Sequence, residues 1–281
     1  MSTSFQRIGI LGGGLLGGSI ALALAEKSDV RLWFRKPDAV MPAKALGINK
    51  ATSDLTEAVS GADLLILAVP VGAMPALLVA AIDAGLPAEC VITDVGSVKK
   101  SVHASLAPIL KKSGNPFIGS HPMAGSERNG IQAARIELFE NAACLLTNDS
   151  SADHAHCAAL VEFWESLGCR ISWLGATAHD ELVARISHLP HVVAAATAKI
   201  ALRNASDGKF GGGGLRDTTR VASGNPAMWA EILTENRVAV IPALKETIAE
   251  LREILATLEK PDQELAQRWL IEAKALRDTL Q

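Results

Sequence analysis

The amino-terminal part of the chain, from Arg7 to about Trp173, alternates short apolar runs with longer segments in which apolar residues recur every three or four positions. Short runs rich in Val, Ile and Leu indicate strands, and the longer segments indicate amphipathic helices. The run from Leu64 to Val69 is apolar throughout, which is typical of a parallel strand buried on both faces. The predicted strands cover residues 7–11, 30–34, 63–69, 90–95, 116–120 and 143–148, and the predicted helices cover 15–27, 74–85, 99–112 and 156–168. Strands that alternate with helices predict a mostly parallel sheet.

The carboxyl-terminal part carries only the helical period. Apolar residues at helical spacing run from His179 to Leu202, from Pro226 to Leu258 and from Asp262 to Leu280. We therefore predict an α/β domain over residues 1–174 and an all-helical second domain over residues 175–281. Four glycines at 211–214 interrupt the helices, either as a flexible joint or as a place of close backbone approach. The helices hold more apolar residues than one helical layer can bury, which predicts a homodimer through this domain.

Composition and charge limit the kinds of partner. The chain has 281 residues, 49% of them hydrophobic, which is enough for about two domains with buried cores. Its 27 basic and 30 acidic residues give a net charge of −3, so no basic field is available to hold a nucleic-acid backbone. The four cysteines stand far apart without a CxxC pair, which predicts buried thiols rather than a zinc site or disulfides. The longest apolar run, Val192 to Leu202, contains a lysine and is too short to cross a bilayer, and no leader sequence opens the chain. We expect a cytoplasmic protein with no membrane partner.

The segment after the first predicted strand carries glycines in the pattern G-x-G-x-x-G. They are Gly12, Gly14 and Gly17, with Leu15 and Leu16 between the second and the third. In such a motif the first glycine makes a tight turn, the second lets the backbone approach a pyrophosphate, and the third permits close helix–strand packing. The N-terminus of the following helix adds partial positive charge. Because the glycines follow a strand and open a helix, we predict a Rossmann-type dinucleotide-binding domain.

The end of the second predicted strand decides which nicotinamide cofactor binds. An Asp or Glu there would hold the 2′-hydroxyl of the adenosine ribose, but this chain has Arg35 and Lys36. Either cation can pair with the 2′-phosphate of NADP, and one charge-assisted bond contributes roughly 1.5–3 kcal/mol, or about a 10- to 100-fold preference. The predicted cofactor is therefore NADP or NAD, with NADP favoured, unless the two cations are merely solvated. Val69 and Pro70 close the next strand at the edge where Rossmann domains bind ligands, although Pro70 would serve equally well to end the strand.

Five blocks, spread over nearly the whole chain, resemble those of one enzyme family. They are residues 12–19, 94–99 (DVGSVK), 119–127 (GSHPMAGSE), 187–191 (SHLPH) and 213–220 (GGLRDTTR). In content and in order they resemble the prephenate/arogenate dehydrogenases of tyrosine biosynthesis, whereas unrelated Rossmann enzymes share only the first block. The resemblance implies NAD(P)-dependent oxidative decarboxylation of prephenate to 4-hydroxyphenylpyruvate, or of arogenate to tyrosine. A hydride leaves ring carbon 4, CO2 leaves ring carbon 1, and the ring becomes aromatic.

His121 and Ser97 are the predicted catalytic residues. The ring hydroxyl must lose its proton as the hydride leaves, and a neutral imidazole within hydrogen-bond reach accelerates such a step by roughly 10²–10⁴-fold. His121 lies between a predicted strand end and Pro122, so it is held in place. By the resemblance, His121 is this base, and Ser97 hydrogen-bonds the same hydroxyl or the histidine. From the residues alone, Ser97 is also a candidate N-cap for a helix that starts at Val98.

The resemblance places four further residues at the substrate. Arg220 matches the family's carboxylate-binding arginine, and a guanidinium can grip a planar carboxylate through two bonds. Arg216 stands four residues earlier and shares a face with Arg220 if the segment is helical, so it serves the carboxylate, the substrate side chain or charge screening. His191 matches a residue that lines the substrate pocket, and is otherwise a buried core histidine. Glu127 matches a residue that gates the site, and is otherwise an acid at a helix start.

Other functions could use the same nucleotide domain. A β-hydroxyacid dehydrogenase shares the two-domain layout but needs a catalytic lysine on a helix, for which Lys199 is the candidate. A nicotinamide-sensing protein would bind cofactor without turnover and would not need the catalytic block. A metal site at His188 and His191 lacks a third ligand at suitable spacing, although residues 179–181 (HDE) lie upstream. We predict no metal.

Overall fold

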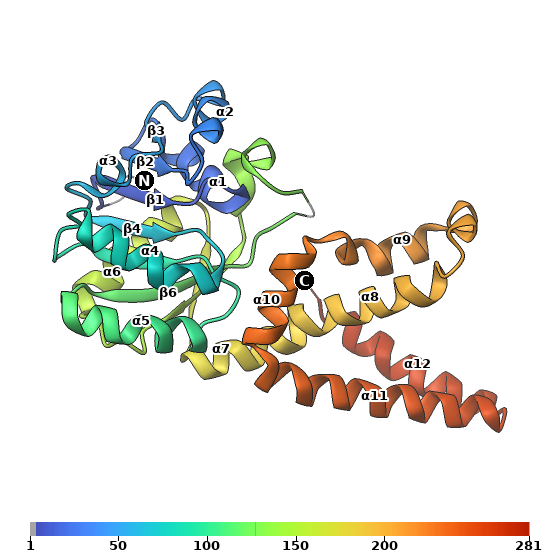
Figure 1. Cartoon of the computed structure of the whole chain (residues 1–281). Helices are drawn as coiled ribbons and strands as arrows, with labels where there is room; N and C mark the ends of the chain where they lie inside the picture. The colour runs from blue at the N-terminus through green and yellow to red at the C-terminus, as the bar shows by residue number, and fades with distance from the viewer. Residues whose placement is uncertain (1–3, 127, 281) are drawn as a thin grey trace.

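A computed structural model describes residues 4–126 and 128–280. Within these residues the amino-terminal domain is built on an eight-stranded sheet in the order β3-β2-β1-β4-β5-β6-β7-β8 (Figure 1). The strands are β1 (Arg7–Leu11), β2 (Asp29–Trp33), β3 (Ala51–Thr52), β4 (Leu64–Leu67), β5 (Val91–Asp94), β6 (Phe117–Pro122), β7 (Ala143–Thr147) and β8 (Arg170–Trp173). All neighbouring pairs are parallel except β6 and β7, which are antiparallel. The first six strands follow the Rossmann order 3-2-1-4-5-6, which confirms the predicted fold class.

Helices cover both faces of this sheet. One apolar core contains side chains from α1 (Leu15–Leu24), α2 (Val40–Ala45) and α6 (His154–Ser166). The opposite core contains side chains from α3 (Leu55–Val59), α4 (Met74–Asp83) and α5 (Lys100–Ser113). Because both faces are covered, every residue of β4 and of β5 is buried, as the apolar sequence of β4 predicts.

The carboxyl-terminal domain is helical over its described residues, which confirms the predicted all-helical second part of the fold. Its α-helices are α7 (Ala176–Val183), α8 (Leu189–Ala201), α9 (Gly213–Thr219), α10 (Pro226–Glu235), α11 (Arg237–Glu259) and α12 (Gln263–Arg277), and a π-helical turn, η5 (Ala184–His188), joins α7 to α8. Short 3₁₀ turns occur in both domains. In the sheet domain they are η1 (Pro37–Ala39), η2 (Val71–Ala73), η3 (Ile131–Ala133) and η4 (Ile136–Phe139), and in the helical domain they are η6 (Ala205–Phe210) and η7 (Arg220–Ser223). Figure 1 shows α7 beside the sheet domain and the α11–α12 pair extending away from it.

Several local elements differ from the sequence prediction. Strands β3 and β8 and helices α2 and α3 are missing from it, because elements of two to six residues carry too few positions to show a period. The predicted helix from Pro226 to Leu258 is broken at Asn236. The segments α7, η5 and α8 form one unbroken helical run, and its π-helical turn directly precedes Pro190, which lacks the N–H that a continuing helix would use. Of the four free cysteines, Cys157 is only half-buried.

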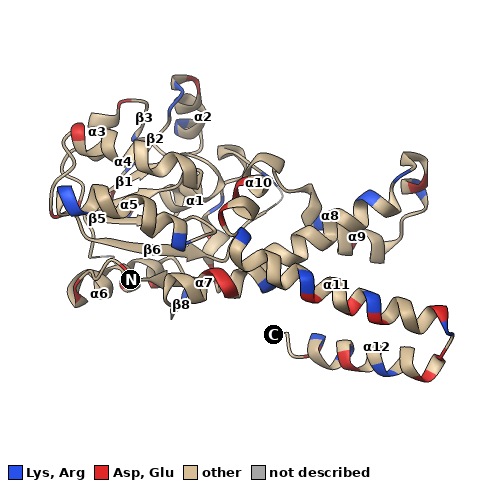
Figure 2. Cartoon of the chain, turned by 60° about the horizontal axis from the view of Figure 1, so that its bottom comes forward, with Lys and Arg blue, Asp and Glu red and all other residues tan. Residues whose placement is uncertain are grey.

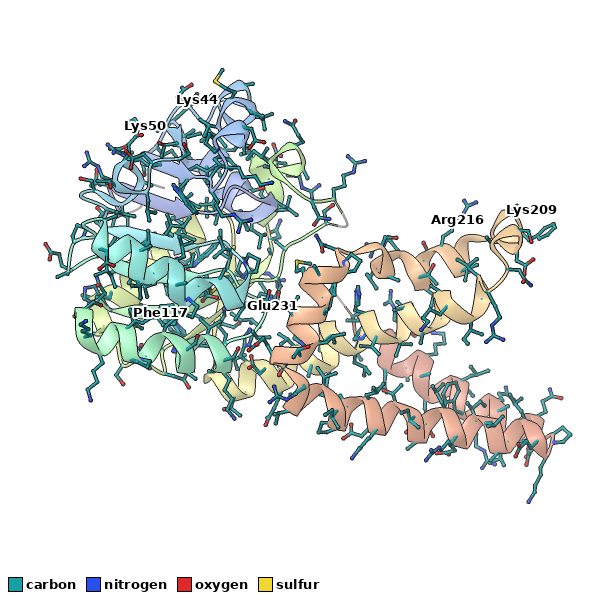
Figure 3. The ribbon with its side chains drawn as sticks, in the orientation of Figure 1. Lys44, Lys50, Phe117, Lys209, Arg216 and Glu231 are labelled. Carbon is teal, nitrogen blue, oxygen red and sulfur yellow. The ribbon has the colours of Figure 1, made fainter. Side chains whose placement is uncertain are left out.

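The two domains pack together at the carboxyl edge of the sheet. Ile232 on α10 is buried in the same apolar cluster as Leu67 and Val71. Beside it, the Gly72 N–H donates a hydrogen bond of 2.6 Å to the carboxylate of Glu231, which is labelled in Figure 3. Figure 2 shows basic and acidic residues interspersed along α11 and α12. Among the described helices, none combines the length and the apolar character needed to cross a bilayer.

Candidate active site between the two domains

The glycine turn after β1 has the geometry that a dinucleotide pyrophosphate requires. Gly12 has a φ of 118°, and a Cβ there would lie 2.3 Å from the Ala68 carbonyl oxygen. A Cβ at Gly17 would lie 2.0 Å from the Gly12 carbonyl oxygen. A Cβ at Gly14, by contrast, would meet nothing within 4 Å. Gly14 is also the N-cap of α1 and offers no side-chain cap, so the first-turn N–H groups of α1 are available to an anion.

This turn lies between β1 and β4, where the strand order reverses and α/β sheets bind ligands. Leu15 and Leu16 are half-buried at the start of α1. Val69 and Pro70 follow β4 directly, and the Val69 side chain would lie 2.9 Å from a Cβ at Gly12. Four of the predicted cofactor residues thus surround the same turn.

Arg35 and Lys36 lie at the far end of the same edge. Both are exposed just after β2, and neither forms an ion pair with another described residue. Phe34, between them and β2, covers the turn: its ring would lie 2.0 Å from a Cβ at Gly13. The two cations are therefore free to meet a ligand, although the structure brings them into contact with no other predicted residue.

His121 is buried near the end of β6 with 7% of its surface exposed. Its neighbour Ser120 holds this strand in place through three bonds. The Ser120 hydroxyl bonds Thr93 at 2.7 Å and accepts from the Trp164 indole at 3.0 Å, and its N–H donates to Asp94 at 3.2 Å. A strand end bonded to both β5 and α6 gives His121 a fixed position.

A chain of hydrogen bonds links His121 to the helical domain. His121 Nδ1 lies 2.9 Å from His179 Nε2, and His179 Nδ1 lies 2.8 Å from Asp180 Oδ1. Both His179 and Asp180 are buried on α7. The Asp180 carboxylate also accepts the backbone N–H groups of Lys99 at 2.8 Å and Lys100 at 3.0 Å. It therefore caps the N-terminus of α5, an element of the other domain.

Burial sets the protonation states in this chain. It lowers the pKa of His121 well below the ordinary 6.5, and the nearby charges of His179 and Lys99 lower that pKa further. Burial also lowers the pKa of His179, although the bond to Asp180 opposes this. For Asp180, burial alone would raise the pKa, but hydrogen bonds from His179 and from backbone N–H groups outweigh it and lower the pKa. Near neutral pH both histidines are neutral and Asp180 is ionised.

Ser97 lies in the turn between β5 and α5 and is half-buried. It is not the N-cap of this helix, as its sequence position suggested, because α5 begins at Lys100 and its N-cap is Lys99. The cap is supplied instead by Asp180. This residue lies 81 positions after Lys99, so no local sequence pattern could identify it. In the same turn the Lys99 ammonium pairs with the Asp94 carboxylate, and both side chains are fully buried.

On the helical side, His191 is buried on α8 and stacks on Trp229 of α10, with ring centroids 3.6 Å apart and planes at 11°. A Cβ at Gly224 would lie 2.4 Å from Trp229 Nε1, so only glycine permits this approach. His188, one turn earlier, is fully buried; its Nδ1 lies 3.1 Å from Asn236 Nδ2, and its Nε2 has no partner among the described residues. Burial lowers the pKa of His188 to about 4.

The two predicted arginines are less tightly placed. Arg216 lies on α9 and Arg220 at the junction of α9 with η7, and both are exposed. The segment is thus helical only as far as Thr219, where it tightens into a 3₁₀ turn. Figure 3 shows Arg216 on the outer side of α9. Among the described residues neither arginine bonds His121, and Val221 next to Arg220 contacts His191 through its backbone. Their role at the carboxylate stays a prediction.

Glu127 lies outside the described residues. The segment that follows it lies on α1, since the Arg135 N–H donates to the Ser19 hydroxyl at 3.0 Å and Ile131 lies 2.5 Å from a Cβ at Gly18. The segment after His121 therefore returns to pack against α1. Within the described part of the chain, no group of three or more His, Cys, Asp or Glu residues is arranged to hold a metal ion.

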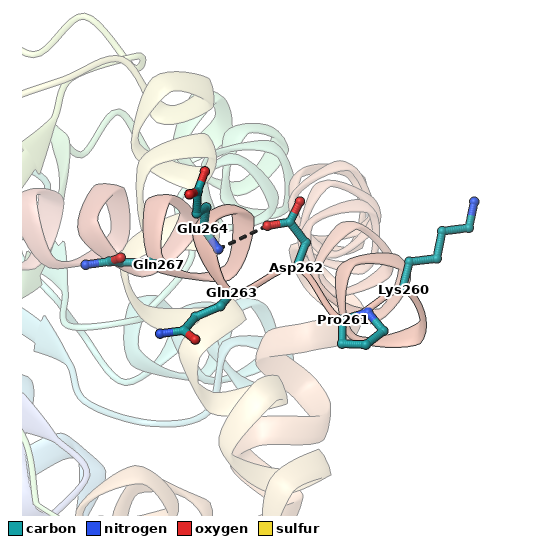
Figure 4. Close-up of a pocket in the computed structure, with 6 residues that line it drawn as sticks. All are labelled: Lys260, Pro261, Asp262, Gln263, Glu264 and Gln267. Atoms are coloured by element: carbon teal, nitrogen blue, oxygen red, sulfur yellow. Dashed lines mark hydrogen bonds between the residues drawn. The ribbon is translucent and has the colours of Figure 1, made fainter.

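Two surface hollows lie elsewhere. One, of 950 Å³, is lined by residues 260–264 and 267 at the turn between α11 and α12 (Figure 4). Figure 4 shows the Asp262 carboxylate capping the start of α12 there. The other, of 500 Å³, lies between α6 and Trp173 of β8. Neither is lined by a residue predicted to act in catalysis.

Both domains of the chain match models of one protein family. The model of the prephenate dehydrogenase nucleotide-binding domain matches residues 20–173, and that of the prephenate dehydrogenase dimerization domain matches residues 175–272. A cyclohexadienyl dehydrogenase of Zymomonas mobilis is 35% identical over 92% of this chain and 91% of its own length. A prephenate dehydrogenase of Bacillus subtilis is 34% identical over 96% of this chain and 75% of its own.

Solved structures give the same result. The prephenate dehydrogenase of A. aeolicus, solved with hydroxyphenyl propionate and NAD+, is 29% identical, covers 99% of both chains and superposes with a TM-score of 0.87. The arogenate dehydrogenase of Synechocystis is 28% identical, with a TM-score of 0.80, over 97% of this chain and 99% of its own. A 3-hydroxyisobutyrate dehydrogenase of Mycobacterium tuberculosis, 19% identical with a TM-score of 0.54 over 81% of this chain and 73% of its own, shares the fold alone. The chain belongs to the prephenate dehydrogenase family.

Proposed function

We propose that this protein catalyses the NAD(P)-dependent oxidative decarboxylation of prephenate or arogenate, with His121 as the base. The observation that carries the proposal is a buried imidazole, neutral at physiological pH, that lies near the end of β6 and is hydrogen-bonded to the helical domain. A neutral imidazole is the form that can accept a proton. The family to which the chain belongs supports the reaction type.

The residues divide the work of the reaction. His121 takes the proton of the ring hydroxyl at Nε2, because its Nδ1 is engaged with His179. Ser97 donates to the same hydroxyl oxygen from the turn after β5. Arg220 binds the carboxylate that leaves as CO2, and His191, stacked on Trp229, lines the pocket. The bound nicotinamide supplies the hydride acceptor.

The dinucleotide site fits this cofactor. Gly14 leaves open space over the free first turn of α1, and that space suits the pyrophosphate. Exposed, unpaired Arg35 and Lys36 stand where an acid would select NAD, and we propose that NADP is preferred over NAD. The ratio of kcat/KM for NADP to that for NAD tests this; a ratio below one would refute the preference.

We propose further that the protein is a homodimer through the helical domain, with the domain boundary between residues 174 and 175. On α12 no described residue is buried, and α11 buries only Val240 and Ala243. The large apolar side chains left exposed on these helices are Val238, Ile241, Ile248, Leu251, Leu255, Leu258, Leu265, Leu270, Ile271 and Leu276. A second copy would cover them. Light scattering at micromolar concentration tests this, and a monomer mass would contradict it.

Turnover is the test of the function itself. The purified protein is mixed with NADP or NAD and with prephenate or arogenate, and reduced nicotinamide is followed by absorbance. The proposal predicts turnover with at least one of these substrates, and the two kcat/KM values decide between keto acid and amino acid. Turnover with hydroxyacids alone would point to a β-hydroxyacid dehydrogenase, although its candidate lysine, Lys199, is exposed on α8.

A further inference from the structure

The hydrogen-bond chain from Asp180 to His121 fixes where each proton lies. A carboxylate only accepts, so the ionised Asp180 requires His179 to donate from Nδ1 across the 2.8 Å bond. A neutral imidazole has one N–H, so His179 Nε2 is left as an acceptor. It then accepts the Nδ1–H of His121 across 2.9 Å. The single proton of neutral His121 therefore lies on Nδ1, and its Nε2 lone pair is free.

This order matters because the opposite tautomer of His121 could not act as a base. With a proton on Nε2, His121 could only donate to the ring hydroxyl. A buried carboxylate that holds a histidine in the productive tautomer is the arrangement of a catalytic triad, here lengthened by one imidazole. When the buried His121 accepts a proton it becomes positively charged. The hydrogen-bond chain stabilises this charge, because it ends on the Asp180 carboxylate.

We propose that His179, anchored by Asp180, is a positioning residue that keeps the proton of His121 on Nδ1 and its Nε2 lone pair available for the reaction. This assignment rests on the proposed function only for its kinetic consequence, since the tautomer exists in the free protein. His179 touches neither substrate nor cofactor in this account and acts through His121.

Further contacts hold the anchor. The two N–H groups at the start of α5 bind the Asp180 carboxylate and, with the positive end of that helix, keep it ionised. From the other side, Asn236 Nδ2 donates to the Asp180 carbonyl at 2.8 Å. The break between α10 and α11 lies at Asn236, so the position of α7 is tied to both domains.

Removal of His179 and its chemical replacement test the proposal. We expect His179→Ala to lower kcat roughly 10²-fold or more, while KM stays within about 3-fold, because only the base is misoriented. Added imidazole fills the space, accepts from His121 and donates to Asp180, and we expect it to restore kcat. 1-Methylimidazole has the acceptor but no N–H, and we expect it to restore little. Equal rescue by both would show that the space merely needs filling and would overturn the proposal.

A matched control separates positioning from packing. His103 is also a buried histidine with two side-chain hydrogen bonds, to Thr147 at 2.8 Å and to Ser150 at 3.0 Å. It does not belong to the hydrogen-bond chain that links Asp180 to His121. We expect His103→Gln to keep kcat within about 3-fold, and His179→Gln, which keeps most of the volume, to lose activity as His179→Ala does. Equal losses in both glutamine variants would refute a specific role for His179.

Nitrogen-15 NMR of the unmodified protein tests the tautomer without any variant. We expect His121 and His179 each to be protonated on Nδ1 and bare on Nε2 in the free protein. A proton on His121 Nε2 would overturn the assignment. If the wild-type protein turns over neither substrate, the proposed function is wrong. The tautomers of His121 and His179 are then still tested by this spectrum.

Discussion

An added methyl group should have different effects on stability at two glycines of the dinucleotide turn, Gly14 and Gly17. At Gly14 the backbone is at φ −79° and ψ −162°, which alanine adopts freely, and a Cβ meets nothing within 4 Å. Gly14→Ala should therefore cost the free protein no more than about 1 kcal/mol, the difference between Gly and Ala at an N-cap. At Gly17 a Cβ would lie 2.0 Å from a backbone oxygen, so Gly17→Ala should cost roughly 1–3 kcal/mol through overpacking.

Cofactor affinity should fall clearly in Gly14→Ala, although the stability of this variant hardly changes. The methyl group at Gly14 occupies the space over the first turn of α1 and would displace the pyrophosphate from one or more N–H groups. Each hydrogen bond to a charged group contributes roughly 1.5–3 kcal/mol, so Kd for NADPH should rise about 10- to 100-fold. Thermal unfolding without ligand and fluorescence titration with NADPH measure the two effects. A Gly14→Ala protein that binds NADPH as tightly as wild type would refute the placement of the pyrophosphate at this turn.

Three further outcomes follow from buried charge and from the substrate anion. Lys99→Met leaves Asp94 as an unpaired buried carboxylate, which costs about 3–5 kcal/mol and should lower Tm by roughly 6–20 °C; Asp94→Asn in the same chain should recover part of the loss, and an unchanged Tm would contradict this. The pKa of His188 falls from 6.5 to about 4 on folding, so its neutral form stabilises the fold by about 3 kcal/mol above pH 6.5 and this is lost as the pH falls toward 4. Denaturation of wild type and of His188→Gln between pH 7 and pH 4 should show the steeper loss in wild type, and parallel curves would refute it. Arg220→Ala should chiefly raise KM for the substrate; an unchanged KM would remove Arg220 from the carboxylate.

Regular periods made the framework predictable from sequence. The apolar run of β4 predicts the sheet, and the glycines of the first turn predict its ligand-binding edge. Both patterns consist of residues that are neighbours in the sequence, so both can be recognised without the structure. The short β3 and α2 gave no such signal. The break of the last helices at Asn236 depends on side-chain bonds to Asp180 and His188, so it could not be read from helical spacing.

The site divides along the same line. His121 is conspicuous in its own segment, but its partner His179 lies 58 positions away, and an adjacent His-Asp pair in an apolar helix has no local feature that reveals what it bonds. The N-cap of α5 was missed for the same reason, since Ser97 is a good local candidate and the residue that accepts the N–H groups there, Asp180, comes from the second domain. Long-range partners of buried polar groups are determined by tertiary packing.

The most direct test of the account is His121→Asn, assayed with saturating nicotinamide and substrate. Asparagine keeps a polar group of smaller volume in the buried end of β6 but cannot accept the ring-hydroxyl proton as an imidazole does. We predict that kcat falls roughly 10²–10⁴-fold while Kd for the nicotinamide cofactor stays within about 3-fold of wild type. A kcat close to that of wild type would contradict the central claim that this imidazole is the base.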